Sequence, residues 1–341
     1  SNTALGSQSL YSNTTASNNT AVGYQSLYTN TAGNNTAVGT QSLYLNTTGA
    51  SLAAHGVEAL YSNTTGSFNA AFGRQALYSN TTASNNTAVG YQAGYSKSTG
   101  NAVTAFGYAA GYSYTASGEN WLSTFLGYQA GYATSTGVDN TFVGGFAGTA
   151  TTTGTANTAM GGGALTANTT GANNTAIGTI ALRYNTTASN NTAVGYQSLN
   201  ANTASSNTAV GFISAVNNTT GSGNTSVGAN SLQSNTTGSS HTAVGLQALY
   251  ANTTGGSNSA FGYTALGFNT TGNYNVAVGH SALYSNTTAS YSTAAGYWSL
   301  KTSNARNTAY GAFSGYQTTS GSNNTFIGDS TATDNTTGSY N

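Results

Sequence analysis

The chain has 341 residues, no cysteine, no proline and a formal net charge of zero, and only 3% of its residues are charged. Without cysteine it forms no disulfide and no thiolate metal site. It offers no basic stripe for nucleic acid, and no apolar run approaches the roughly 20 residues of a membrane span, so we expect neither nucleic-acid binding nor membrane insertion.

From its first residues onward the chain repeats one pattern, Thr-Ala-Val-Gly followed by a polar residue, then Gln, Ser or Ala, and Leu. Twenty glycines carry this pattern, and fifteen of the nineteen intervals between them are 17 residues long. The glycines are Gly6, Gly23, Gly39, Gly56, Gly73, Gly90, Gly107, Gly127, Gly144, Gly161, Gly178, Gly195, Gly211, Gly228, Gly245, Gly262, Gly279, Gly296, Gly311 and Gly328. Self-similarity at such a period is typical of stacked repeat architectures. The sequence therefore predicts an all-β fold, a parallel β-solenoid (β-roll) of about 20 coils with a 17-residue repeat.

The repeat leaves no room for an independent globular unit, so we expect one solenoid array over residues 1–341. The array begins and ends inside a repeat, at Ser1 and Asn341, and neither end carries an atypical capping repeat. This predicts that the chain is a segment of a longer protein.

Each coil is expected to place its strand just before the glycine. The residue directly before the glycine is apolar in 17 coils, the exceptions being His55, Ala295 and Tyr310, which predicts a core position. The residue before that is Ala in sixteen coils. Adjacent residues of a strand point to opposite faces, so apolar residues at both positions predict a strand covered on both sides. One face would line the lumen, and the other would pack on the same surface of a neighbouring subunit, which predicts a homo-oligomer.

The polar positions of the coil also recur in fixed places. Thr and Asn precede the alanine in most coils, and a Gln column follows the glycine; stacked at about 4.8 Å, such side chains predict hydrogen-bonded ladders. A Ser or Ala three residues after the glycine in nineteen coils predicts a closely packed position. Length changes fall in the Tyr-Ser-Asn-Thr-Thr-Gly-Ser-Asn portion, which predicts an exposed corner. A bulky residue at Ala176 should disturb packing, whereas an insertion after Thr187 should be tolerated.

The coils of residues 91–148 depart from the pattern. The Leu position becomes glycine at Gly94, Gly111, Gly131 and Gly148, and again at Gly315. Aromatic residues gather in the same coils and are expected to fill the volume that the leucines leave. They are Phe106, Tyr108, Tyr112, Trp121, Phe125, Tyr132, Phe142 and Phe146. The alternative is an exposed aromatic patch for stacking against the sugars of a cell-surface glycan.

The sequence shows no constellation of residues suited to catalysis, to a cofactor or to a metal ion, so we expect no enzyme activity. The three histidines, His55, His241 and His280, occupy different positions of different coils. His55 stands at the predicted core position and is interpreted as an interior or interface residue. The acidic residues form no pair that recurs at a catalytic separation. They are Glu58, Glu119, Asp139, Asp329 and Asp334.

Most corners carry Asn-Thr-Thr or Asn-Asn-Thr, which are formal N-glycosylation acceptors. The acceptor residues include Asn13, Asn18, Asn46, Asn63, Asn80, Asn85, Asn168, Asn173 and Asn190. Asn also favours turns and ladders for its own reasons, so we interpret these residues as structural, with glycan attachment as the alternative.

The repeated Asn-Thr-Ala-Val-Gly-Tyr-Gln-Ser-Leu, as at residues 191–199, resembles two related groups of proteins. One is the heads of trimeric autotransporter adhesins, in which a similar Ala-Ile-Gly motif builds a left-handed parallel β-roll. The other, the closer likeness, is the shafts of long phage tail fibres with Asn-Thr-Ala-x-Gly-Tyr-Gln-Ala-Leu repeats. The likeness spans the chain and implies a homotrimer.

These observations predict a non-enzymatic, extracellular structural fibre or shaft of the tail-fibre or adhesin type, on a virion or a cell surface. A nearly uncharged surface is indifferent to salt, which suits an appendage in water of variable composition. The alternatives are a surface filament whose coils stack end to end, a glycan-binding solenoid, and an ice-binding solenoid. Ice binding requires flat, exposed Thr ranks, and the Thr column is expected to point to the same side as the predicted core position.

Overall fold

A computed structural model describes residues 1–116 and 122–341. Its described residues hold twenty strands and no helix, in two compact units, Ser1–Asn174 and Thr175–Asn341. The strands of the first unit are β1 (Asn2–Leu5), β2 (Asn19–Val22), β3 (Thr36–Val38), β4 (Ala53–His55), β5 (Ala70–Phe72), β6 (Thr87–Val89), β7 (Val103–Phe106), β8 (Ser123–Leu126), β9 (Thr141–Val143) and β10 (Thr158–Met160). Those of the second are β11 (Thr175–Ile177), β12 (Thr192–Val194), β13 (Thr208–Val210), β14 (Thr225–Val227), β15 (Thr242–Val244), β16 (Ser259–Phe261), β17 (Val276–Val278), β18 (Thr293–Ala295), β19 (Asn307–Tyr310) and β20 (Asn324–Ile327).

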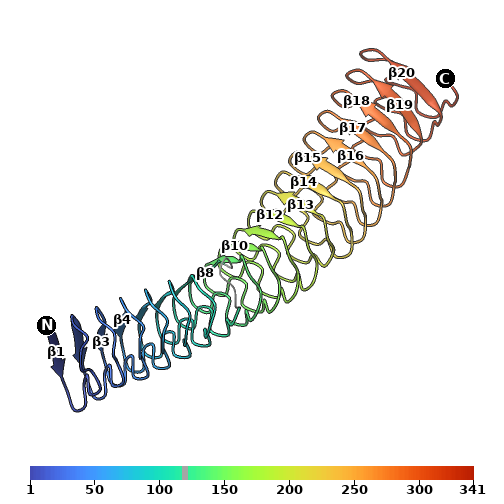
Figure 1. Cartoon of the computed structure of the whole chain (residues 1–341). Helices are drawn as coiled ribbons and strands as arrows, with labels where there is room; N and C mark the ends of the chain where they lie inside the picture. The colour runs from blue at the N-terminus through green and yellow to red at the C-terminus, as the bar shows by residue number, and fades with distance from the viewer. Residues whose placement is uncertain (117–121) are drawn as a thin grey trace. The chain divides into compact units, whose positions relative to one another are not determined.

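Within each unit, successive strands lie side by side in chain order and pair in parallel (Figure 1). The register places like over like: in β12 and β13, Thr192 pairs with Thr208 and Ala193 with Ala209. Each unit is therefore a parallel β-solenoid with one short strand per turn of about 17 residues, which confirms the predicted fold class. The single array over residues 1–341 and the homotrimer stay predictions.

The central glycine of each turn is required by both conformation and space. These glycines have φ angles between +123° and +146°, a region that side chains of L-residues rarely enter. They also stack closely: a Cβ atom on Gly228 would lie 2.6 Å from the carbonyl carbon of Gly245 in the next turn. The recurring glycine therefore reflects the spacing of the turns.

The interior of each turn is narrow and built from three positions. The alanine two residues before the glycine, the Ser or Ala three residues after it and the leucine four residues after it are all buried, as in Ala193, Ser198 and Leu199. The buried Ser198 hydroxyl donates a hydrogen bond of 2.9 Å to the carbonyl oxygen of Ala209 in the next strand. The prediction of a closely packed position three residues after the glycine is confirmed.

The residue directly before the glycine lies on the outside, so the prediction of a core position is wrong. Phe106 is 51% exposed and Val278 is 43% exposed, whereas the preceding Ala105 and Ala277 are fully buried. The strand alternates as an ordinary strand does, and the alanine takes the inward direction because the lumen has room only for a small side chain. The outer neighbour of an inward alanine must then face away from the lumen.

Two asparagine ladders run inside each unit. In the first, four residues before the glycine, the main-chain N–H of Asn35 donates to Oδ1 of Asn19 at 3.0 Å, and Nδ2 of Asn35 donates to the Gly49 carbonyl at 2.9 Å. This confirms the predicted ladder. The second is built from the Asn of Asn-Thr-Thr, as where Nδ2 of Asn46 donates to Oδ1 of Asn30 at 2.7 Å. These asparagines are buried, so the exposed corner begins only after them.

The repacking predicted for residues 91–148 is confirmed for two of the aromatic residues. Phe125 and Phe142 replace the inward alanine and are fully buried. A Cβ atom on Gly111 would lie 2.6 Å from Cδ2 of Phe125, so the ring occupies the volume that a leucine would need. The glycines at these positions also have φ near +60°, which glycine adopts without the strain that leucine carries there.

The other aromatic residues named for these coils do not fill the core, which corrects that part of the prediction. Phe106, Tyr108 and Phe146 are exposed, and Tyr112 and Tyr132 are partly exposed on the outside of the turns. They stand at outward positions of the repeat, whereas the space that the leucines leave lies inside the turns. Trp121 lies outside the described residues.

A rule follows from the buried phenylalanines. Phe125 has Gly111 on the preceding turn and Gly131 on its own, and Phe142 has Gly131 and Gly148. The third inward phenylalanine, Phe326, has Gly315 on the preceding turn and Ala332 on its own. An inward phenylalanine thus stands where neither turn carries a leucine at the leucine position. Ala243 instead has leucines at both places, Leu232 and Leu249, and all three side chains are buried.

We therefore expect Ala243→Phe alone to destabilise the protein by about 1–3 kcal/mol through overpacking. Adding Leu232→Gly and Leu249→Gly should recover most of that loss. Urea unfolding followed by circular dichroism measures both changes. If the triple variant were less stable than Ala243→Phe, the exchange of volume would be refuted.

Candidate functional site

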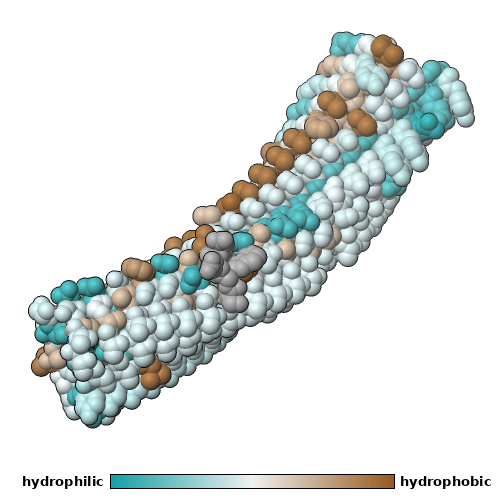
Figure 2. All heavy atoms as spheres, viewed as in Figure 1, coloured by the Kyte–Doolittle hydropathy of each residue, from teal (hydrophilic) through white to brown (hydrophobic). Residues whose placement is uncertain are grey.

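The outer face of the sheet is the most regular surface of each unit. It carries two columns per strand, a threonine three residues before the glycine and an apolar residue directly before it, as in Thr192 and Val194. In the second unit a row of apolar residues follows the strands (Figure 2). In the first unit the apolar column is Leu5, Val22, Val38, His55, Phe72, Val89, Phe106, Leu126, Val143 and Met160. In the second it is Ile177, Val194, Val210, Val227, Val244, Phe261, Val278, Ala295, Tyr310 and Ile327.

This outer face, defined by these two columns, has no carboxylate, lysine or arginine at any position. Its apolar column is partly or fully exposed in every turn. His55 belongs to it, and its ring stacks on Phe72 with centroids 5.0 Å apart. Of the two predicted roles for His55, the interior one is wrong because the position faces outward, and the interface one stays a prediction. Contiguous apolar surface of this length is unusual on a monomeric protein.

A second surface carries aromatic and amide side chains. The tyrosines five residues after the glycine form an uninterrupted stack in the first unit, with neighbouring centroids 5.0–5.2 Å apart. Its members are Tyr11, Tyr28, Tyr44, Tyr61, Tyr78, Tyr95, Tyr112 and Tyr132. The sequence interpretation missed this stack, although the same residue type at one position of eight successive coils was a readable signal.

The glutamine column forms the predicted ladder beside the tyrosines. Nε2 of Gln25 donates to Oε1 of Gln8 at 2.8 Å, and Nε2 of Gln92 donates to Gln75 at 2.8 Å. Glu58 takes a glutamine position, and its Oε2 accepts a 2.8 Å hydrogen bond from Gln75. Glu58 thus serves as a member of the ladder.

Two of the remaining acidic residues accept hydrogen bonds from nearby groups. Asp139 accepts a 3.3 Å bond from the main-chain N–H of Leu122, and Asp329 accepts one of 3.2 Å from the Ser330 hydroxyl. Asp334 lies in an exposed corner, and Glu119 lies outside the described residues. Among residues 1–116 and 122–341, no three His, Cys, Asp or Glu side chains come together in a way that could hold a metal ion.

His241 replaces an asparagine of the first ladder and is 1% exposed. Its main-chain N–H donates to Oδ1 of Asn224 at 3.0 Å, and its Nδ1 accepts from the main-chain N–H of Asn258 at 3.2 Å. That acceptor role requires Nδ1 to carry no proton. Burial lowers the pKa of His241 to about 4, so the imidazole is neutral at pH 7. His280 is exposed and sits between Tyr263 and Tyr297.

Lys97 is a buried cation that the sequence interpretation did not single out. It replaces an asparagine of the second ladder and is 1% exposed. Its Nζ donates to the Ala116 carbonyl at 2.7 Å and lies 4.5 Å from the ring centroid of Tyr114. Burial lowers the pKa of Lys97 to about 8. Because a lysine cannot reproduce the asparagine contacts, Oδ1 of Asn80 on the preceding turn has no hydrogen-bond partner.

The formal glycosylation acceptors divide into two classes. The Asn of Asn-Thr-Thr, as at Asn46 and Asn63, is buried and donates within the second ladder. The first Asn of Asn-Asn-Thr is exposed, as at Asn18 and Asn85, with φ near +60°. The structural interpretation therefore fits the first class, whose amides a glycan could not reach in the folded chain.

No helix in the described residues is long and apolar enough to cross a membrane. No known family model matches the chain, and no curated protein matches it.

Proposed function

We propose that the chain is a non-enzymatic structural shaft, built from copies of itself that pack through the outer face. The observation that carries this proposal is the apolar column that each strand presents to the outside. A second copy supplies a surface with the same turn-to-turn spacing, so every turn meets an equivalent turn. The outer face also lacks charged side chains, so its burial leaves no lysine, arginine or carboxylate without a partner.

The extracellular location and the tail-fibre or adhesin type of shaft belong to the same proposal. The likeness of the repeats to tail-fibre and adhesin repeats supports it. The closed ladders of Asn, Gln and Tyr support it as well, because they stabilise the turns without disulfides. Homotrimers are our expectation for the assembled form.

Ice binding is the second candidate, since the threonine column lies outward and not toward the core. The expectation that these threonines point inward is wrong, because they lie on the same face of the strand as the residue directly before the glycine, and that face is the outer one. Ice binding, however, requires a flat face, and Phe72, Met160, Phe261 and Tyr310 project from the neighbouring column. Assembly with another copy accommodates such side chains. Thermal hysteresis of the purified protein would favour ice binding instead.

The oligomer is tested by placing charges on the outer face. In Val194→Asp, Val227→Asp and Phe261→Asp combined, the substitutions stand two turns apart, which keeps the new carboxylates from stacking directly. Burying unpaired carboxylates costs several kcal/mol each, so we expect the assembly to dissociate. Native mass spectrometry and analytical ultracentrifugation measure the change in mass.

The matched control places three aspartates on the exposed corner, at Thr187, Thr220 and Thr254, also two turns apart. It should assemble as the unmodified chain does. If the unmodified chain is a monomer at micromolar concentration, or if both triple variants remain assembled, the proposal is refuted.

A further inference from the structure

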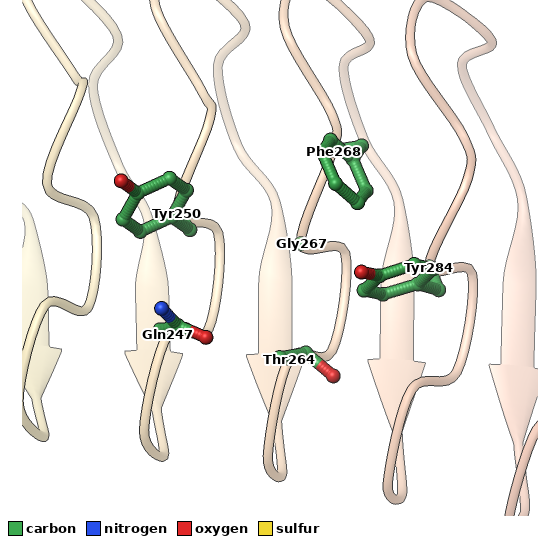
Figure 3. A pocket seen from close by; sticks show the side chains of 6 residues that line it. All are labelled: Gln247, Tyr250, Thr264, Gly267, Phe268 and Tyr284. Atoms are coloured by element: carbon green, nitrogen blue, oxygen red, sulfur yellow. The ribbon is translucent and has the colours of Figure 1, made fainter.

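One turn of the second unit carries small residues at both the tyrosine position and the glutamine position of the repeat. After β16, Gly267 stands where the neighbouring turns carry Tyr250 and Tyr284, and Thr264 stands where the preceding turn carries Gln247. Two small residues thus replace two large ones side by side. The turn therefore lacks the large side chains that the preceding turn carries at these two positions, and the surface is hollowed there (Figure 3).

The hollow has a volume of about 260 Å³ and is lined by Gln247, Tyr250, Thr264, Gly267, Phe268 and Tyr284. Figure 3 shows Tyr250 and Tyr284 on the turns on either side of Gly267. Rings on neighbouring turns of the tyrosine stack are about 5 Å apart, as between Tyr61 and Tyr78. The absence of a ring at Gly267 leaves a slot beside Tyr250, and Phe268 and Tyr284 form its other aromatic walls.

The walls of the hollow are held by packing. A Cβ atom on Gly267 would lie 3.3 Å from Cδ2 of Tyr284, so the Tyr284 ring lies against the glycine and forms one wall of the hollow. Phe268 packs its ring edge to face on Tyr284, with centroids 4.8 Å apart and planes at 85°. Thr264 is 7% exposed, and its hydroxyl is 2.8 Å from the hydroxyl of Ser281.

A second hollow of about 240 Å³ adjoins the first and shares Gln247, Thr264 and Tyr284 with it. Its other side carries Trp298 and Lys301, with the Lys301 ammonium 3.9 Å from the centroid of the Trp298 ring. Trp298 also stands at a glutamine position. The side-chain columns are therefore reshaped over several successive turns.

We propose that these two hollows bind two consecutive pyranose rings of a glycan chain. Sugar rings present apolar C–H faces that pack on aromatic rings, and hydroxyl edges that hydrogen-bond to amides and hydroxyls such as Gln247 and Thr264. The first hollow is smaller than the roughly 300–1,000 Å³ of a drug-sized pocket, so it fits a single ring. No carboxylate lines either hollow, and Lys301 lies in the second, so neutral and acidic sugars are both admitted.

This site differs from the aromatic coils 91–148, for which the sequence suggested glycan stacking. There the exposed rings of Tyr91, Tyr108 and Tyr128 stack on one another, with centroids 5.0–5.3 Å apart, and no gap separates them. The site at Gly267 also uses none of the outer-face columns. It therefore stands or fails independently of the proposed assembly.

The test begins with an array of defined oligosaccharides that contain neutral, amino and acidic hexoses. Isothermal titration calorimetry then measures the affinity of each oligosaccharide that binds. Trp298 and Trp121 are the two tryptophans of the chain, so Trp121→Phe leaves the Trp298 emission as a local reporter. We expect that emission to change on binding.

Gly267→Tyr restores the residue of the neighbouring turns and fills the slot. We expect it to weaken binding at least tenfold while the chain stays folded. The matched control is Gly145→Tyr, where no atom lies within 4 Å of an added Cβ; it should bind as the unmodified chain does. Tyr250→Leu removes one wall, supplies a test if Gly267→Tyr fails to fold, and should weaken binding similarly.

Three outcomes would overturn the proposal. The first is that no oligosaccharide of the array binds at millimolar concentration. The second is that Gly267→Tyr and Tyr250→Leu both bind as tightly as the unmodified chain. The third is that free phenol or indole binds in the slot and no saccharide does. The last result would assign the slot to an aromatic side chain.

Discussion

Gly228→Ala is expected to reduce the free energy of unfolding by about 3 kcal/mol or more, from backbone strain and steric overlap together. Gly228 has a φ of +137°, and an added Cβ would overlap the carbonyl oxygen of Gly245 and lie 2.6 Å from its carbonyl carbon. That neighbour is backbone, so only a separation of the two turns relieves the overlap. Urea unfolding of the purified variant measures the loss.

The control is Gly145→Ala, since Gly145 has no atom within 4 Å of an added Cβ and stands directly after a central glycine. It should change stability by no more than about 0.5 kcal/mol, as surface substitutions usually do. Equal stability of the two variants would show that the glycine column is not set by the spacing of the turns.

Acidification from pH 7 to pH 4 is expected to cost about 3 kcal/mol of stability through His241 alone. In the unfolded chain the imidazole takes up a proton near its ordinary pKa of about 6.5, whereas the folded chain holds the pKa at about 4. The unfolded state therefore binds more protons in this range, and stability falls as the pH falls. Above pH 7 the term is constant.

His241→Asn restores the residue of the ladder and removes the titration. Its Oδ1 is placed to accept the N–H of Asn258, as Oδ1 of Asn224 accepts the N–H of His241. The unfolding free energy of this variant should vary between pH 7 and pH 5 by less than that of the unmodified chain. His280→Asn, at an exposed position, is the matched control and should keep the acid sensitivity. Identical pH profiles for the unmodified chain and His241→Asn would contradict the assignment.

The sequence was sufficient for the fold class, the register and two of the ladders, because each rests on identity between turns. Thr192 over Thr208 and Gln25 over Gln8 follow once the period is known. The Leu-to-Gly exchange was also readable as a change of volume. The stack of Tyr28 on Tyr44 needed only the same reasoning and was missed.

The direction of each side chain could not be obtained in the same way. Alternation along the strand says that Ala105 and Phe106 face opposite sides, but not which side is the lumen. The conformation of the turns determines which side faces the lumen. These turns place residues other than glycine in the left-handed region, which the residue types do not predict: Leu199 has a φ of +49° and Gln197 one of +56°. Likewise, the hollow at Gly267 depends on what two adjacent turns lack, and pattern matching on a single turn passes over it.

The stacking of like on like has a consequence for how such a chain can change in length. Each turn offers its successor the same carbonyls, amides and glycine that it received from its predecessor, as Asn46 does between Asn30 and Asn63. Loss or duplication of one whole repeat therefore rejoins matching ends, and unequal crossing-over within the coding sequence yields a chain that is shorter or longer yet has no new junction to accommodate.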